Sequence, residues 1–333
     1  MSLSRREFLG SVAAGAATLP FVPGRVLGQA GQTPPSEKLN IAGVGVGGMG
    51  ASNLKAVESQ NIVALCDVDD AKAAETYKRY PGARTFRDYR KMLDALGKEI
   101  DAVIVATPDH THAVVALECM KRGKHVYVQK PLTRTVAEAR ALTEAARTYK
   151  VVTQMGNQGA SGEGVRLMCE WIWDGAIGPV REVHAWTNRP VWPQGLDRPK
   201  DTPPVPATLD WDLWIGPAPM RPYHPAYHPW NWRAWQDFGT GALGDMACHI
   251  LDPVFKALKL RYPTSVCASV STQCREMWKV WENTESYPLS TMVHFDYPAR
   301  GDMPPRGPGS RSVPWWTADR TPCSPRPSTS PCT

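Results

Sequence analysis

The segment 41–50, IAGVGVGGMG, is the strongest constraint on the fold, because it places a cluster of glycines directly after a short apolar stretch. Two overlapping G-x-G-x-x-G patterns are present, Gly43/Gly45/Gly48 and Gly45/Gly47/Gly50. We favour the second, because the strand then ends before its first glycine and the next helix offers its N-terminal amides to a pyrophosphate. The pattern predicts a phosphate-binding turn formed by Gly45, Gly47, Gly48, Met49 and Gly50.

Asp67 follows this turn by about twenty residues, at the end of the next apolar stretch, where a carboxylate can accept hydrogen bonds from an adenosine ribose. Asp69 and Asp70 stand beside it, and the three carboxylates together would repel a ribose 2′-phosphate. The expected cofactor is therefore NAD, with NADP less favoured. The alternative is a flavodoxin-like sheet whose tight turns bind no dinucleotide.

Apolar stretches alternate with amphipathic ones over residues 31–158, which indicates a doubly wound parallel sheet of the Rossmann type. The predicted strands are 39–44, 61–67, 101–107, 125–130 and 151–155, and the predicted helices are 51–59, 70–80, 88–96, 112–123 and 135–150.

Residues 159–300 form a second predicted domain, of α/β type, for substrate binding and oligomerisation. We expect helices at 164–174 and 242–251, and strands at 180–188, 265–273 and 290–298 in an open, mainly antiparallel sheet that is incomplete at its C-terminal end. The segment 189–238 is rich in Pro and Trp, which favours an ordered, irregular excursion over a linker.

The two ends of the chain have unusual compositions. Residues 1–30 contain Arg5-Arg6, a weakly apolar run and small residues at Gly28 and Ala30, and are similar to a cleavable twin-arginine (Tat) signal, with an amphipathic arm as the alternative. We therefore expect a periplasmic or otherwise exported protein that engages the Tat machinery. Residues 301–333 are rich in Pro and Ser, so they are expected to be disordered or to result from a frameshift.

Charge and cysteine usage exclude several functions. The net charge is +6, but residues 1–30 and 301–333 each contribute +2, which leaves no basic footprint for nucleic acid. No apolar run reaches the roughly 18 residues of a membrane span. The eight cysteines lack metal-ligand spacing and are expected to be mostly buried free thiols, and no metal site is predicted.

The stretch 107–132, TPDHTHAVVALECMKRGKHVYVQKPL, resembles the glucose-fructose oxidoreductase and inositol dehydrogenase family, usually called Gfo/Idh/MocA. The runs MGNQG at 155–159 and GALGDMACHILD at 241–252 agree with it. The resemblance implies NAD(P) bound between two domains, a sugar or polyol substrate, and a possible homo-oligomer formed through the second sheet. It also implies two sets of contacts: Thr107, Pro108, His112, Gln129 and Lys130 toward the cofactor, and Asn157 toward the substrate.

The same resemblance implies a catalytic set of Lys130, Asp245 and His249. Gln129 replaces the glutamate of the family's Glu-Lys-Pro motif, which removes a charge beside Lys130. Asp245 and His249 are four residues apart, so one helical face presents both. His249 would take a hydroxyl proton during hydride transfer, Lys130 would stabilise the same oxygen, and Asp245 would orient the sugar or the imidazole.

Other candidates carry weaker signals. Trp192 and Trp232 suit stacking against a sugar, although core packing explains each one as well. His112 can simply cap the turn after Pro108. His224 and His228 have the spacing of a helical metal pair, but prolines follow both of them and disfavour a helix there.

Export separates the protein from cytoplasmic NAD, so the sequence predicts a cofactor that is held tightly and recycled in the site. One route oxidises a sugar or polyol and then reduces a second carbonyl compound. A second route, that of an NAD-dependent glycosidase, borrows hydride, eliminates the glycoside and returns the hydride. A third possibility is a truncated, non-catalytic sugar-binding protein.

Overall fold

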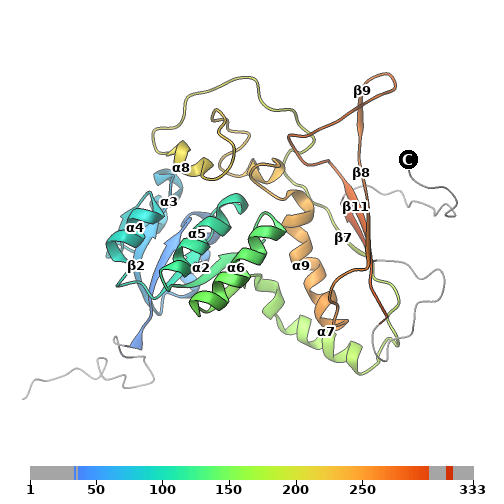
Figure 1. Cartoon of the computed structure of the whole chain (residues 1–333), viewed down its shortest axis with the longest axis horizontal. Helices are drawn as coiled ribbons and strands as arrows, with labels where there is room; N and C mark the ends of the chain where they lie inside the picture. Colours follow the sequence, from blue (N-terminus) through green and yellow to red (C-terminus); the bar gives the residue numbers. More distant parts are fainter. Residues whose placement is uncertain (1–33, 35–36, 300–312, 318–333) are drawn as a thin grey trace, which may run out of the picture.

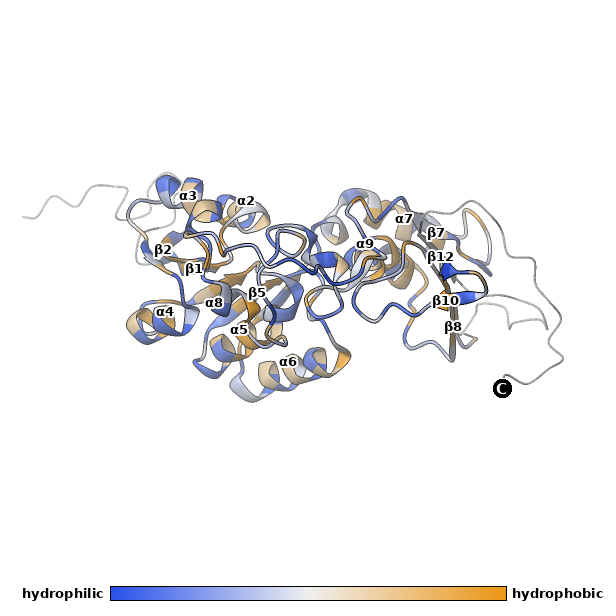
Figure 2. Cartoon of the chain, turned by 90° about the horizontal axis from the view of Figure 1, so that it is seen from above, coloured by the Kyte–Doolittle hydropathy of each residue, from blue (hydrophilic) through white to orange (hydrophobic). Residues whose placement is uncertain are grey.

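The computed structural model describes residues 34, 37–299 and 313–317. The predicted signal at 1–30 and the other residues of the tail at 301–333 lie outside these described residues. Two α/β domains lie side by side, and helix α9 of the second lies nearest the first (Figure 1). The same two lobes are seen from above in Figure 2.

The first domain contains a parallel sheet of six strands in the order β3-β2-β1-β4-β5-β6, which is the Rossmann order. The strands are β1 (Asn40–Val44), β2 (Asn61–Cys66), β3 (Arg84–Phe86), β4 (Ala102–Val105), β5 (His125–Gln129) and β6 (Thr153–Gly156). Five of them were predicted. The edge strand β3 was missed because it has only three residues and no apolar alternation.

Five helices cover this sheet (Figure 1). They are α2 (Gly48–Ala56), α3 (Asp70–Arg79), α4 (Tyr89–Leu96), α5 (Asp109–Lys121) and α6 (Val136–Tyr149). Residues of α4, α5 and α6 share one buried core with the strands, and Leu54 of α2 and Ala73 of α3 share another. Each face of the sheet is thus buried, as the continuous apolarity of its strands predicts.

The second domain is built on α7 (Glu163–Trp173) and α9 (Gly241–Ala257) and a sheet of order β7-β12-β11-β8. Its strands are β7 (Ala185–Thr187), β8 (Ser265–Val270), β11 (Thr291–Asp296) and β12 (Val313–Thr317), and β9 (Gln273–Glu276) pairs separately with β10 (Lys279–Trp281). β8, β11 and β12 are antiparallel, while β7 runs parallel to β12. Strand β12 falls within the tail for which we predicted no regular structure.

Two local expectations in this domain differ from the structure. The predicted strand 180–188 pairs only over Ala185–Thr187. Pro253 in the sequence predicts a kink or a helix restart at Asp252, and the restart does not occur, because α9 continues through Pro253 to Ala257. A proline fixes φ near the helical value, so one residue can be accommodated at the loss of a single backbone hydrogen bond.

The structure can also be compared with the predictions for cysteine burial and for membrane-spanning segments. Cys66, Cys119 and Cys169 are buried free thiols as predicted, whereas Cys267 and Cys274 are exposed. In the described part of the chain, no helix is both long and apolar enough to cross a membrane.

The Trp-rich segment 189–238 folds back over the first domain instead of forming a linker (Figure 1). It contains α8 (Trp211–Ile215) and the short helix η5 (Asn231–Ala234), and it buries a cluster of aromatic side chains that includes Trp211, Trp214 and Trp235. The amide of Asp210 donates to the carbonyl of Val68 (2.8 Å), and the amide of Asp70 donates to the carbonyl of Thr208 (3.1 Å). The segment is therefore fixed to the end of β2.

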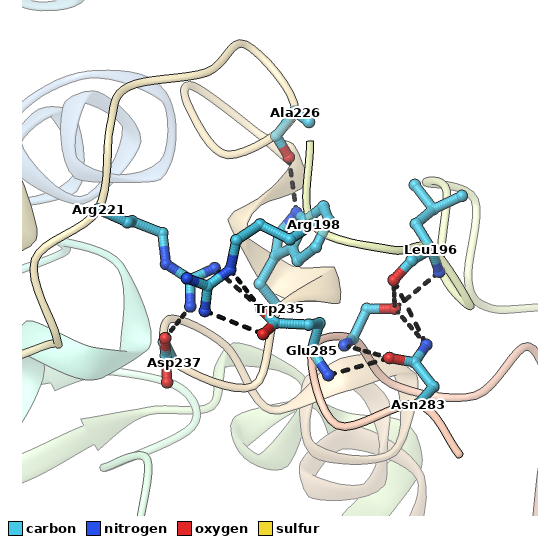
Figure 3. Close-up of polar contacts among 9 residues, drawn as sticks. Leu196, Arg198, Arg221, Ala226, Trp235, Asp237, Asn283 and Glu285 are labelled. Atoms are coloured by element: carbon cyan, nitrogen blue, oxygen red, sulfur yellow. Dashed lines mark hydrogen bonds and ion pairs between the residues drawn. The ribbon is translucent and has the colours of Figure 1, made fainter. Parts of the chain in front are cut away.

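A polar network anchors the other side of this segment (Figure 3). Arg221, with only 3% of its side chain exposed, forms ion pairs with Asp237 and Glu285 and lies against the Tyr227 and Phe238 rings. Arg198, half exposed at 50%, donates two hydrogen bonds to the same Glu285. One carboxylate thus holds a buried and an exposed arginine.

These two arginines allow a matched test of what burial contributes. Arg221→Met leaves Asp237 without its buried partner, so we expect it to lower the free energy of unfolding by about 3 kcal/mol. Arg198→Met should cost only about 0–1 kcal/mol, because its ion pair is solvated. Urea unfolding of both variants measures the difference, and equal losses would contradict a structural role for the buried guanidinium.

Candidate active site

A pocket of about 920 Å³ lies where the two domains and the Trp-rich segment meet. Its walls come from the turn after β1, the ends of β2, β4 and β5, helix α9, and parts of the segment 189–233. Doubly wound sheets bind ligands beside the carboxyl ends of their strands, at the point where the strand order reverses. In this sheet that point lies between β1 and β4. The volume is at the upper end for small-molecule sites, which range over about 300–1,000 Å³.

Gly45, Gly47 and Gly48 of the glycine turn line one end of this pocket. Gly45 has φ +76°, and a Cβ there would meet the backbone of Ala106 at 2.7 Å. A Cβ on Gly50 would lie 1.8 Å from the carbonyl oxygen of Gly45, so only glycine lets α2 approach the turn. Gly48 opens α2 and has no atom within 4 Å of a Cβ position. The preference for Gly45/Gly47/Gly50 is thus supported by close backbone contacts.

Asp67 lies at this end of the pocket and holds the glycine turn in place. Its Oδ2 accepts from the amides of Val46 (2.8 Å) and Gly47 (3.3 Å), and its Oδ1 accepts from the amide of Asp69 (3.0 Å). A carboxylate has about four acceptor positions, so one remains for a ribose hydroxyl. Burial raises the pKa of Asp67, and the three backbone amides oppose that rise.

Of the three carboxylates expected to repel a 2′-phosphate, only Asp67 lines the pocket, so the expected repulsion by Asp69 and Asp70 is corrected. Asp69 accepts from the amide of Ala71 at the start of α3 and from His228 Nε2 (2.8 Å). Asp70 forms an ion pair with Arg87. Both side chains thus bind groups of the protein itself: Asp69 is the N-cap of α3, and Asp70 pairs with Arg87.

The ends of β4 and β5 supply the middle of the pocket, where Thr107, Pro108, Gln129 and Lys130 form part of the wall. Gln129 is buried, and its Nε2 has no hydrogen-bond partner in the described residues. His112 does not line the pocket. Its ring nitrogens face the carbonyl oxygens of Thr107 and Pro131, each at 2.8 Å, so it holds the two turns together from behind.

The three predicted catalytic residues meet in the same pocket. Lys130 Nζ donates to the Asp245 carboxylate (2.8 Å) and to the Asp245 carbonyl (3.0 Å). His249 lies one helical turn further along α9, and both burial and the positive charge of Lys130 lower its pKa. The geometry therefore offers a neutral imidazole as a proton acceptor beside a fixed ammonium group, while Asp245 orients Lys130.

Several charged residues that line the pocket were not predicted from the sequence, and Asp109, Arg189 and Arg233 are the ones near the predicted catalytic residues. Asp109 is 4% exposed and accepts from Thr240 Oγ1 (2.8 Å), and burial raises its pKa to about 7. Arg233 lies 3.5 Å from Asp245 Oδ1. The signals were available: Asp109 follows Pro108 in the matched motif, and Arg233 stands alone among tryptophans in WNWRAW.

The predicted substrate contacts are only partly brought together. Trp192 and Trp232 line the pocket but are mostly buried, at 4% and 8% exposed, so core packing accounts for much of each ring. Asn157 does not line the pocket, and its Nδ2 donates to the carbonyl of Cys248 (2.7 Å) in α9. Asn157 thus positions helix α9, which carries Asp245 and His249.

The rejected metal pair is separated in the structure as well. His224 lies 3.3 Å from Asp201, whereas His228 pairs with the buried Asp69. The two imidazoles bind different carboxylates.

Asp109 provides a pH-dependent test of the site. Its pKa is raised above the unfolded value, so its ionisation in the folded state costs stability as the pH rises from about 4 to about 7. Asp109→Asn removes this cost while keeping an acceptor for Thr240. We expect Asp109→Asn to raise the free energy of unfolding, relative to the wild type, by about 2–3 kcal/mol more at pH 8 than at pH 5.

Thermal unfolding at the two pH values measures this difference. The control is Asp197→Asn, at a carboxylate that is 55% exposed, for which a much smaller pH-dependent change is expected. An Asp109→Asn effect that is the same at both pH values would contradict a buried, weakly acidic Asp109.

Comparison with known proteins places this geometry in a family. Residues 39–157 match the oxidoreductase family described as an NAD-binding Rossmann fold, and residues 181–287 match its C-terminal alpha/beta domain. The chain is 25% identical to levoglucosan dehydrogenase of Pseudarthrobacter phenanthrenivorans over 65% of this chain and 50% of that protein. It is 38% identical to inositol 2-dehydrogenase of Rubrobacter xylanophilus over 45% of this chain and 44% of that protein.

Solved structures share the fold. An NAD-binding protein from Listeria innocua superimposes with a TM-score of 0.58 at 17% identity, over 84% of this chain and 67% of that chain. Levoglucosan dehydrogenase in complex with NADH and L-sorbose gives a TM-score of 0.57 at 21% identity, over 84% and 66%. The chain spans about half the length of the curated relatives it matches.

The fold expectation and the NAD expectation are both confirmed by these matches. The two matched domains together cover more than half of the sequence, and the chain therefore belongs to the Gfo/Idh/MocA family of oxidoreductases.

Proposed function

We propose that this protein is an NAD-dependent dehydrogenase that oxidises a CH–OH group of a sugar or polyol. The single observation that carries the proposal is the meeting of Lys130, Asp245 and His249 in one pocket with the glycine turn. The names of the relatives, levoglucosan dehydrogenase and inositol 2-dehydrogenase, support the substrate class.

The residues of the pocket fit the dinucleotide. Gly45 to Gly50 and the N-terminus of α2 would hold the pyrophosphate, Asp67 would bind the adenosine ribose, and Thr107, Pro108 and Gln129 would flank the nicotinamide. The unpartnered Nε2 of Gln129 is a buried donor that a bound group can satisfy. The cofactor supplies the hydride acceptor.

The protein's own residues then act on the substrate hydroxyl. His249 accepts the hydroxyl proton, and its lowered pKa keeps the imidazole neutral for that role. Lys130 is held by two contacts to Asp245, so its ammonium group can donate to the same oxygen and stabilise the developing negative charge.

We also propose that the protein is exported with NAD bound and that the cofactor is recycled in the site. Residues 1–30 support export through the Tat pathway to the periplasm. The Trp-rich segment, fixed to the end of β2 by the backbone bonds of Asp70 and Asp210, supports retention of the cofactor beneath it. We further propose a homo-oligomer formed through the second sheet, which is supported by exposed apolar side chains such as Trp186, Val266 and Val270.

An NAD-dependent glycosidase is the second candidate, and Asp109 favours it. That chemistry needs an additional proton-transfer group to remove a C–H proton, and a carboxyl with a pKa of about 7 in the same pocket meets the need. The two candidates give different products, either a keto-sugar or a hydrolysed glycoside. Mass spectrometry after incubation with sugars, polyols and glycosides, without added NAD, distinguishes them.

Substitution of the catalytic pair tests the proposal. We expect His249→Ala to lower kcat by about 10²–10⁴-fold through loss of the base. We expect Lys130→Met to lower it by about 10²–10³-fold through loss of the oxyanion contact. In the wild type, the acid limb of the pH profile should lie below the ordinary histidine range, because a base with a lowered pKa stays unprotonated at lower pH.

The control for His249→Ala is His184→Ala, since the His184 side chain is 58% exposed and lies outside the pocket. This variant should keep wild-type kcat. Hydride transfer at the wild-type rate in His249→Ala or Lys130→Met would defeat the assigned roles.

Export with a bound cofactor has its own test. The periplasmic fraction of expressing cells should contain the protein, and denaturation should release about one NAD or NADH per chain, as expected of a site that excludes free exchange. An Arg5→Lys, Arg6→Lys double variant should stay in the cytoplasm. Periplasmic protein that contains no nucleotide, or that turns over only with continuous external NAD, would refute cofactor retention.

A further inference from the structure

We propose that the substrate is an acidic sugar, and that Arg189 and Arg233 bind its carboxylate beside the catalytic residues. This inference rests on the proposed dehydrogenase function and specifies its substrate class. It is carried by the placement of two guanidinium groups in the same pocket as Lys130, Asp245 and His249.

Arg233 is held rigidly at the catalytic end of the pocket. Its guanidinium carbon lies 4.0 Å from the centre of the Trp230 ring and 4.2 Å from that of Trp232, and its Nη1 donates to the carbonyl of Trp230 (3.1 Å). Its side chain is 18% exposed. A planar guanidinium fixed between aromatic rings is prepared for bidentate recognition of a carboxylate, since little side-chain freedom remains to be lost.

Arg189 is the second cation, and it lacks a carboxylate partner within the described residues, where no ion pair reaches its side chain. Its charge is felt by Arg233, whose pKa is lowered first by burial and then also by the positive charge of Arg189. Two guanidinium groups so placed repel one another, and an anion between them removes that cost.

The balance of charge at this end of the pocket favours an anionic ligand. Lys130, Arg189 and Arg233 contribute three positive charges, while Lys130 and Arg233 both contact the single carboxylate of Asp245. Asp109 compensates only partly, because its pKa is raised to about 7 and it is protonated for much of the time near neutral pH. The phosphates of a bound dinucleotide would not supply the missing charge here, since the glycine turn that would hold them lies at the other end of the pocket.

The aromatic neighbours restrict the class of the anion. Trp230 lines the pocket beside Arg233 and is 53% exposed, and a flat exposed ring suits the C–H face of a pyranose, whereas Trp192 and Trp232 line the same wall but are mostly buried. A hydroxylated ring that carries one carboxylate matches both features. The expected ligand is thus a hexuronic acid, free or as the end of a glycoside, oriented by its carboxylate so that a ring hydroxyl meets His249.

Kinetics with matched pairs test this inference on the intact holoenzyme. The probes are glucuronate with glucose, galacturonate with galactose, and mannuronate with mannose, each as free sugar and as methyl glycoside. We expect kcat/KM for at least one uronate to exceed that of its neutral partner by about 10-fold or more, which is the discrimination of one well-placed charge-assisted contact. Raising the salt concentration should reduce the ratio.

The variant that decides is Arg189→Met, because Arg189 is outside the buried aromatic cluster. It should reduce the uronate-to-hexose ratio by about 10-fold, with the loss mainly in KM. Arg189→Lys should restore part of the ratio, and Arg166→Met, an exposed arginine on α7, should leave it unchanged. If Arg189 had only a structural role, Arg189→Met would lower kcat/KM equally for both substrates of a pair.

Three results would overturn the proposal. If the protein turns over neutral hexoses or polyols at the same rate as the uronates, and the reaction still depends on His249, the acidic substrate is refuted and the dehydrogenase function stands. A uronate preference that survives Arg189→Met would refute the assigned subsite. Absence of turnover for both members of every pair would count against the acidic-sugar class, and the broader panel used above would then decide whether the dehydrogenase fails as well.

Discussion

The contact between Lys130 and Asp245 is the interaction on which the site depends. Lys130 follows β5 of the first domain, whereas Asp245 lies in α9 of the second, so their two hydrogen bonds fix the domains at the point where chemistry is proposed. The side chains are only 17% and 13% exposed, and a charge in such a place must be paired. The same bond therefore joins the domains, orients the ammonium group and sets the field that acts on His249.

Several ionisable groups of the pocket lie near this contact, and burying their charged forms costs free energy. Burial weakens the basicity of His249 and of Arg233 and weakens the acidity of Asp109, each in the direction expected when water is removed. Trp192 and Trp232 belong to the aromatic cluster of the Trp-rich segment and also line this pocket, so they place apolar surface beside these charges.

The sequence predicted most of the fold because the relevant signals are local. Apolar stretches marked five of the six Rossmann strands, and Gly45 and Gly50 showed their roles through spacing alone. The predicted catalytic residues followed from a family resemblance, and all three line one pocket. Contacts between residues far apart in the sequence could not be predicted, because the partners of Asp69 and His112 depend on how distant turns pack in the fold. Arg189 and Arg233 could not be recognised as candidate binding residues until the structure showed that they line the same pocket as Lys130.

The pairing of Asp69 with His228 spans 159 residues of the chain and has a consequence for the order of assembly. The nucleotide-binding half is synthesised first, but the wall over the end of β2 arrives only with the much later segment around His228. A contact of such high sequence separation has a large cost in loop-closure entropy, and folds rich in such contacts fold slowly. Because Asp69 precedes His228 by 159 residues, this pair cannot close the nucleotide end of the pocket until the later segment has been synthesised and has docked.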